Sequence, residues 1–153
     1  MKLQIWALPL LSIIWMSTAC NQSEAQGVQD LTTQQFEDNI NKSDKRILLD
    51  VRTPEEFAQY HLKGAVNVNV FGNFITDINA LQIDKESPVF VYCLAGSRSA
   101  KAANQLVDAG YKLVYNMEGG ISTWIGEKRP VISPENAMQV GMSVAEFNHQ
   151  SQA

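Results

Sequence analysis

The chain has 153 residues and a mass of 17.0 kDa, with 45% apolar residues, 18% charged residues and two cysteines. This length suits one domain with short extensions, and the composition excludes both a wholly disordered chain and a disulfide-dense miniprotein. A formal charge of −4 and a pI near 5.1 provide no basic footprint, so we expect no nucleic-acid partner.

Residues 1–19 have the layout of a secretory signal peptide. Lys2 precedes a run from Leu3 to Met16 without charge, and small residues then lead up to Ala19. The apolar run is shorter than the roughly 20 residues of a membrane span, and Pro9 interrupts it. The alternative interpretation is a plain amino-terminal anchor helix.

Cys20 follows Ala19 directly, and this end of the chain resembles a bacterial lipoprotein signal with its lipobox. The resemblance implies that Cys20 is lipidated and, after cleavage, becomes the amino terminus of an exported protein of the cell envelope. Ser17 departs from the pattern, because the family usually has leucine there, and ordinary signal-peptidase cleavage near Ala19 is the alternative. Asn21 implies the outer membrane if the cell is Gram-negative.

Residues 20–28 are interpreted as the lipid anchor site and a polar tether, and the stretch 21–30 has few bulky apolar side chains. Without residues 1–19 the chain has a net charge of −5.

From residue 31 onward, short apolar runs alternate with segments of helical periodicity. The predicted strands span residues 47–51, 65–70, 89–92 and 113–116. The predicted helices span residues 31–42, a segment from Thr53, residues 73–81, residues 99–109 ending at Gly110, and a short segment after Gly119-Gly120. Thr53, Pro54 and Glu56 form a capping-box start with proline at the first helical position. The alternation predicts an α/β fold with a small, mostly parallel sheet and helices on both faces.

Cys93 ends the clearest predicted strand, and a loop of small residues leads from it into a helix. In parallel sheets, ligands gather at this edge, and a helix amino terminus lowers the pKa of a cysteine thiol. Gly96 and its small neighbours allow backbone N–H groups to surround the sulfur, and Arg98 adds positive charge. The pattern predicts a nucleophilic thiolate in an anion-binding loop, against the alternative of a buried structural cysteine.

Several stretches carry a resemblance to a known family. In chain order they are Leu48–Arg52, Pro54–Phe57, His61–Asn67, Val91–Cys93, Gly96–Ser99, Ala109–Tyr111, Glu118–Gly120 and Trp124. With these stretches, residues 29–130 resemble a single rhodanese-like sulfurtransferase domain. Lys63 departs from the pattern, because proline is more usual before Gly64-Ala65.

The resemblance implies that Cys93 accepts a sulfane sulfur as a persulfide from a small sulfur-containing anion such as thiosulfate, and passes it to cyanide or a thiol. The implied persulfide-binding residues are Leu94, Ala95, Gly96, Ser97 and Arg98. Related phosphatases of this fold have a loop one residue longer, so the six residues from Cys93 to Arg98 favour sulfur over phosphate. No cofactor and no metal site is expected, and a thiol-redox protein is a candidate partner.

Supporting roles are assigned to residues around this loop. The resemblance implies that Asp50 braces the loop and that Arg52 assists. Arg98 either contacts the anionic substrate or caps its own loop. His61 is expected to be structural and Trp124 to belong to the core.

Two other functions stay open: a non-catalytic rhodanese-fold binding module in the envelope, and, with less support, a phosphatase or arsenate reductase. Residues 131–153 form a tail in which Ser143–Glu146 is a capping-box pattern, so the tail is either a short closing helix or a loose end.

The lipid anchor has a direct test. Cells that express the protein and receive a labelled fatty acid should incorporate the label into the wild type and not into Cys20→Ala. An unlabelled wild type, or equal labelling of the two proteins, would exclude lipidation at Cys20.

Overall fold

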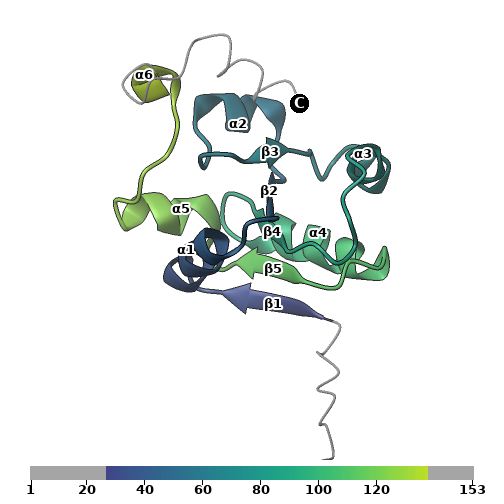
Figure 1. Ribbon diagram of the computed structural model, residues 1–153. Coiled ribbons are helices and arrows are strands. Elements are labelled where there is room, and N and C mark those ends of the chain that lie inside the picture. The colour runs from purple at the N-terminus through teal and green to yellow at the C-terminus, as the bar shows by residue number, and fades with distance from the viewer. Residues whose placement is uncertain (1–26, 138–153) are drawn as a thin grey trace, which may run out of the picture.

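A parallel five-stranded sheet positions the site residues. The computed structural model describes residues 27–137, in which the strands have the order β1-β5-β4-β2-β3 (Figure 1). The strands are β1 (Val28–Leu31), β2 (Ile47–Asp50), β3 (Val66–Asn67), β4 (Val89–Tyr92) and β5 (Val114–Met117). β4 lies between β5 and β2, and all four of its residues are buried. Its carboxyl end is therefore the middle of the edge where α/β proteins place their ligands.

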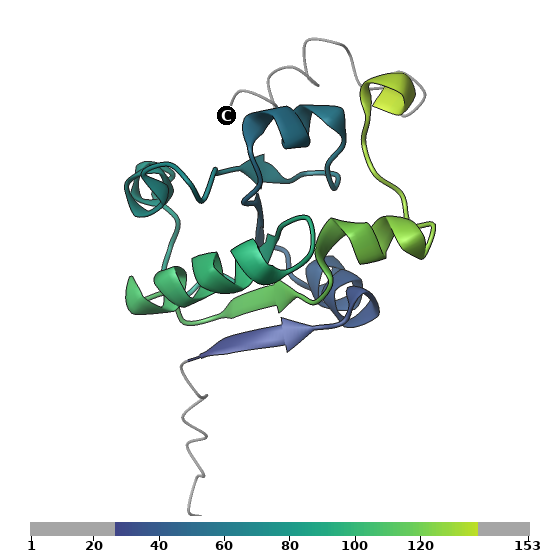
Figure 2. The same ribbon diagram turned by 180° about the vertical axis from the view of Figure 1, so that it is seen from behind.

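Helices cover both faces of the sheet, as predicted. The helices are α1 (Thr33–Lys42), α2 (Pro54–Gln59), α3 (Phe74–Ala80), α4 (Ser97–Asp108), α5 (Gly120–Gly126) and α6 (Pro134–Ala137). α1 and α5 lie on one face, and the view from behind shows α4 across the other (Figures 1 and 2). The predicted α/β class is confirmed.

The side chains of β4 alternate between two hydrophobic clusters. Val89 and Val91 join the cluster under α3 and α4, whereas Phe90 and Tyr92 join the cluster under α1 and α5. Phe90 makes an edge-to-face contact with Phe36 of α1, with ring centroids 5.4 Å apart. Because both faces are buried, the strand is a continuous apolar run.

The predicted capping box starts α2. The Glu56 N–H donates to Thr53 Oγ1 at 3.3 Å, and the Thr53 N–H donates to Glu56 Oε2 at 3.1 Å. Pro54 occupies the first helical position, where its missing N–H removes no helical hydrogen bond. Thr32 and Gln35 form an equivalent box at α1, which ends at Lys42 as expected but begins at Thr33, two residues later than predicted.

The sequence pattern does not predict β1. Residue 28 ends the stretch interpreted as a tether, and residues 28–30 belong to the polar stretch 21–30, yet they pair with β5 from Val28↔Val114 onward. Gln29 and Asp30 are exposed because β1 is an edge strand. The strand therefore lacks the apolar pattern by which a sequence indicates a strand. The tether, interpreted as residues 20–28, therefore overlaps β1 at Val28. Asp30 also accepts a hydrogen bond from Asn116 Nδ2 at 2.7 Å.

β3 and α4 differ from prediction at their ends. β3 is limited to Val66–Asn67, because the Asn67 side-chain amide donates to the carbonyls of Asp50 and Arg52 as the chain turns away. α4 begins at Ser97 and not at residue 99, because Gly96 adopts a left-handed conformation that starts the helix at once.

The end of the predicted domain continues slightly past residue 130. Ile132 forms an antiparallel bridge with His61, and the short α6 follows. The predicted closing helix at Ser143–Glu146, the signal peptide and Cys20 lie outside the described residues. Between residues 27 and 137 we find no helix with the length and apolar character needed to cross a membrane.

A buried ion pair lies at the carboxyl end of β2. The side chains of Asp50 and Arg52 are 0% and 1% exposed, and Arg52 Nη2 lies 2.6 Å from Asp50 Oδ2. Arg52 Nε donates to both carboxylate oxygens at 3.0 Å, and Nη2 also donates to the Tyr60 carbonyl at 2.6 Å. The guanidinium lies 5.0 Å from the Tyr60 ring centroid. The pair thereby ties the end of β2 to the chain after α2.

Removal of one partner should leave an uncompensated buried charge. We expect Asp50→Ala to lower the free energy of unfolding by about 3–5 kcal/mol, as for other broken buried ion pairs. Urea denaturation provides the measurement, and Asp38→Ala on the exposed face of α1 is the matched control, with a change within about 0.5 kcal/mol. A loss below about 1 kcal/mol for Asp50→Ala would contradict the role assigned to this pair.

Candidate functional site

Cys93 lies where β4 ends and the loop to α4 begins. It is a free cysteine, and its side chain is buried. Only three residues separate it from Ser97, the first residue of the 12-residue α4. Its sulfur therefore lies at the amino-terminal end of that helix, where unpaired N–H groups and the helix dipole favour negative charge.

Two hydrogen-bond donors contact the sulfur. The Gly96 N–H donates to Cys93 Sγ at 3.1 Å, and Ser99 Oγ lies 3.4 Å from Sγ. Burial raises the pKa of the Cys93 thiol, but hydrogen bonds from Ser99 and from the N–H groups of Ala95 and Gly96 outweigh it, so the pKa lies below that of an ordinary cysteine. The loop thus stabilises a thiolate.

Gly96 is required by the backbone of the loop. Its φ of +94° is left-handed, a region that residues with a Cβ rarely adopt. A Cβ at this position would also lie 3.2 Å from the backbone nitrogen of Gly119. The turn that directs the Gly96 N–H to the sulfur therefore depends on glycine.

The first turn of α5 holds the other side of the loop. The Ile121 N–H donates to the Cys93 carbonyl at 2.9 Å, and the Ser122 N–H donates to the Leu94 carbonyl at 3.0 Å. A Cβ on Gly120 would lie 2.4 Å from the Cys93 carbonyl oxygen, so only glycine permits this approach. Gly120 thus allows the backbone of α5 to approach the loop closely.

At the rim of the loop, Arg98 forms a bidentate ion pair with Glu56 of α2. Arg98 Nη1 and Nη2 lie 2.7 Å from Glu56 Oε2 and Oε1, respectively. The pair lowers the pKa of Glu56 to about 2. The sequence predicts that Arg98 either contacts the substrate or caps its own loop. The ion pair with Glu56 of α2 is a third interaction, which neither role includes.

The outer surface of the loop is open. Leu94, Ala95 and Ser97 are exposed, and Phe71 beside Arg98 is 70% exposed. A shallow pocket of about 250 Å³ adjoins the loop and is lined by Val70, Phe71, Ser97, Arg98, Lys101 and Gln105. A donor or an acceptor can reach the loop from this side.

Asp50 and Arg52 lie one strand away, and their side-chain bonds go to each other and to Tyr60. Two contacts link this segment to the residue before Cys93: the Val51 N–H donates to the Tyr92 carbonyl, and the Arg52 guanidinium lies 6.0 Å from the Tyr92 ring centroid. The bracing role of Asp50 and Arg52 stays a prediction.

His61 and Trp124 have packing roles. His61 is buried, stacks on Phe57 with ring centroids 4.0 Å apart, and donates from Nδ1 to the Phe57 carbonyl. Trp124 is 6% exposed and donates from Nε1 to the Pro130 carbonyl at 2.9 Å. Within residues 27–137, no three His, Cys, Asp or Glu side chains are grouped to hold a metal ion.

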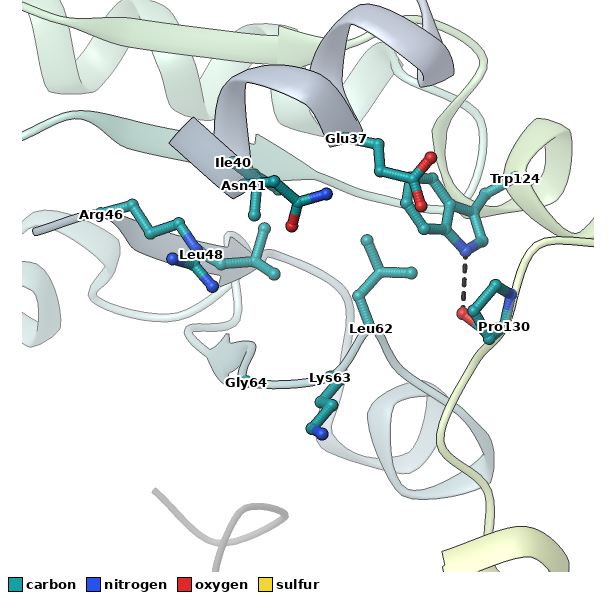
Figure 3. Close-up of a pocket in the computed structure, with 10 residues that line it drawn as sticks. All are labelled: Glu37, Ile40, Asn41, Arg46, Leu48, Leu62, Lys63, Gly64, Trp124 and Pro130. Atoms are coloured by element: carbon teal, nitrogen blue, oxygen red, sulfur yellow. Dashed lines mark hydrogen bonds between the residues drawn. The ribbon is translucent and has the colours of Figure 1, made fainter. Parts of the chain in front are cut away.

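A second pocket, of about 440 Å³, lies on the face covered by α1 and α5 (Figure 3). Ile40, Leu48, Leu62 and Trp124 provide apolar walls, and neither Cys93 nor its loop contributes to it. This pocket is therefore separate from the loop of Cys93, whose residues Ser97 and Arg98 line the other pocket.

The sequence pattern points to Cys93 and its loop but not to two of their partners. Ser99 lies inside the matched stretch, yet a serine there is also an ordinary first-turn helix residue. Glu56 is accounted for by its capping box, so its second bond to Arg98 carries no separate signal.

These features define an α/β protein with a thiolate-stabilising loop at the carboxyl edge of its sheet. The sequence model of the rhodanese-like domain family matches residues 32–127 of this chain. A relative named sulfurtransferase from Allochromatium vinosum is 30% identical over 108 residues, which are 71% of this chain and 98% of the relative. Thiosulfate sulfurtransferase 18 from Arabidopsis thaliana is 33% identical over 99 residues, covering 57% of this chain and 72% of the relative.

Solved structures agree. The polysulfide-sulfur transferase homodimer from Wolinella succinogenes superposes with a TM-score of 0.61 at 28% identity, covering 71% of this chain and 80% of that one. The chain belongs to the rhodanese-like domain family and is homologous to sulfurtransferases.

The contact between Ser99 and Cys93 should be visible in the reactivity of the thiol. Alkylation by iodoacetamide requires the thiolate, so its rate should rise with pH through the lowered pKa of Cys93. Loss of the hydroxyl in Ser99→Ala removes a bond to the charged form, so the midpoint should move to higher pH.

The control is Ser97→Ala, which keeps the backbone N–H groups and removes an exposed hydroxyl, and its midpoint should match the wild type. Equal midpoints for Ser99→Ala and the wild type would contradict the stabilisation assigned to Ser99.

Proposed function

We propose that this protein is a sulfurtransferase that carries sulfane sulfur as a persulfide on Cys93. The observation that carries the proposal is the pair of contacts to its sulfur, from the Gly96 N–H at 3.1 Å and from Ser99 Oγ at 3.4 Å. Both donors belong to the start of α4, and the same groups that stabilise a thiolate suit the anionic outer sulfur of a persulfide.

The transfer proceeds in two steps. The Cys93 thiolate attacks the outer sulfur of thiosulfate, the bond between the two thiosulfate sulfurs breaks, and sulfite leaves with its electron pair. The acceptor, cyanide or a thiolate, then attacks the outer sulfur of the persulfide. The disulfide-type bond breaks and returns the Cys93 thiolate, with thiocyanate or a new persulfide as product.

The size of the loop supports sulfur over phosphate. Six residues run from Cys93 to Arg98, and the loop is fixed on one side by α4 and on the other by the first turn of α5. A single sulfur atom needs less room than a tetrahedral phosphate. A phosphatase or arsenate reductase therefore receives less support than a sulfurtransferase.

The donor is proposed to be a small sulfur-containing anion of the thiosulfate type, and the acceptor cyanide or a thiol, including the thiol of a redox protein. The relatives support this class through their names, which include a thiosulfate sulfurtransferase and a polysulfide-sulfur transferase. The open side of the loop, where Leu94 and Ala95 are exposed, supports access by either reactant.

The protein is further proposed to act in the cell envelope, anchored through lipid on Cys20. The support is the signal-like layout of residues 1–19 and the position of Cys20 after Ala19. If Cys20 carries the lipid, Cys93 has no second cysteine in its own chain for a disulfide. Its thiol would then stay available for sulfur transfer.

Sulfur loading provides the decisive experiment for this function. Purified protein incubated with thiosulfate should gain the mass of one sulfur atom, localised to Cys93 by peptide mass spectrometry, and addition of cyanide should release thiocyanate. Cys93→Ser should lose both signals, whereas Cys20→Ala, which removes the other cysteine, should retain them. If no sulfane donor adds sulfur to Cys93, the binding-module alternative is favoured instead.

A further inference from the structure

The ion pair at the rim of the loop uses the full hydrogen-bonding capacity of one edge of Arg98. Both terminal nitrogens bond to the two oxygens of Glu56 at 2.7 Å. Bidentate pairs of this kind are stronger and more rigid than single contacts. With side chains 21% and 27% exposed, Arg98 and Glu56 are partly shielded from water, so their charges are only partly screened.

Arg98 also lies within electrostatic reach of the sulfur. The pKa of Arg98 is raised chiefly by Glu56, and the negative charge of Cys93 contributes in the same direction. A free guanidinium at this position would attract an anionic donor to the loop. Because Glu56 supplies an equal and opposite charge at hydrogen-bond distance, Arg98 offers a donor little net positive charge, and Lys101 is the other cation that lines the adjoining pocket.

We propose that Glu56 is a specificity-determining residue that, by engaging Arg98, favours singly charged sulfane donors over the doubly charged thiosulfate. This inference rests on the proposed sulfurtransferase function. A dianion gains twice as much as a monoanion from a free positive charge at the rim. Compensation of Arg98 therefore costs thiosulfate more binding energy than it costs a monoanion.

The chain permits a substitution that changes the charge and keeps the fold. Glu56 also closes the capping box with Thr53, and glutamine serves in that position as well as glutamate. Glu56→Gln therefore retains the helix start, removes the negative charge and leaves one side-chain oxygen acceptor in place of two. Glu55 is the adjacent residue, is exposed, and has no ion pair with Arg98, so Glu55→Gln makes the same change of net charge as a control.

Two donors with the same reacting bond separate charge from chemistry. Thiosulfate is a dianion, and methanethiosulfonate is a monoanion with the same outer sulfur. The Cys93 thiolate takes the outer sulfur from either one. The bond between the two donor sulfurs breaks, and sulfite or methanesulfinate leaves with the electron pair, so the enzyme gains one sulfur in both cases.

We expect Glu56→Gln to raise kcat/KM for thiosulfate about fivefold relative to methanethiosulfonate. A change of this size corresponds to the interaction energy of one partly exposed charge pair. The change should appear mainly in KM, because it alters attraction of the donor and not the reaction at sulfur. It should shrink as salt is added. Glu55→Gln should leave the ratio of the two donors unchanged.

An unchanged donor ratio in Glu56→Gln, or an equal rise in Glu55→Gln, would overturn the inference while the sulfurtransferase function stands. If neither donor loads Cys93 in the wild type, the proposed function fails and the inference falls with it. Mass spectrometry of the loaded protein distinguishes these results.

Discussion

The structure depends on one short connection, the turn that converts β4 into α4. A strand buried on both faces delivers Cys93 to the centre of the sheet edge, and a left-handed glycine starts the helix three residues later. Because the turn is so short, the unpaired N–H groups of the helix start lie at the sulfur and not in solvent. The first turn of α5 closes on the same loop through the carbonyls of Cys93 and Leu94. The chemistry of the site follows from this clamp of backbone groups.

Two arginine–carboxylate pairs surround the clamp and have different physical consequences. Asp50 and Arg52 are fully buried and connect β2 to the chain after α2, so the pair contributes to the integrity of the fold. Arg98 and Glu56 are partly exposed at the opening, where a charge acts on what approaches and contributes little to stability. The buried Asp50–Arg52 pair thus stabilises the fold, whereas the partly exposed Glu56–Arg98 pair is proposed to affect which sulfur donor binds.

Local patterns could be predicted where one interaction dominates. The apolar run of β4 and the capping box of Thr53 with Glu56 are such cases, because burial and backbone hydrogen bonding determine them directly. β1 could not be predicted, since an edge strand with exposed Gln29 and Asp30 lacks an apolar pattern and pairs with β5 through its backbone.

The site shows the same division. The position of Cys93 and its loop could be predicted because an apolar strand followed by a glycine-containing loop places the cysteine at a helix amino terminus. The contacts of Ser99 with the sulfur and of Glu56 with Arg98 depend on spatial placement, in the second case across 42 positions of the chain. Ser99 is also an ordinary first-turn helix residue, and Glu56 is also part of a capping box. Because these local roles explain both residues, the sequence does not indicate their second contacts.

The most direct test of the backbone clamp is the amide NMR spectrum of the isotope-labelled protein before and after sulfur loading by thiosulfate. If the N–H groups of the loop hold the outer sulfur, the amide resonances of Ala95 to Ser99 should move strongly downfield and return when cyanide removes the sulfur. Cys93→Ser should show no such change. Loading confirmed by mass, with loop amides that do not move, would contradict the clamp as the device that holds the persulfide.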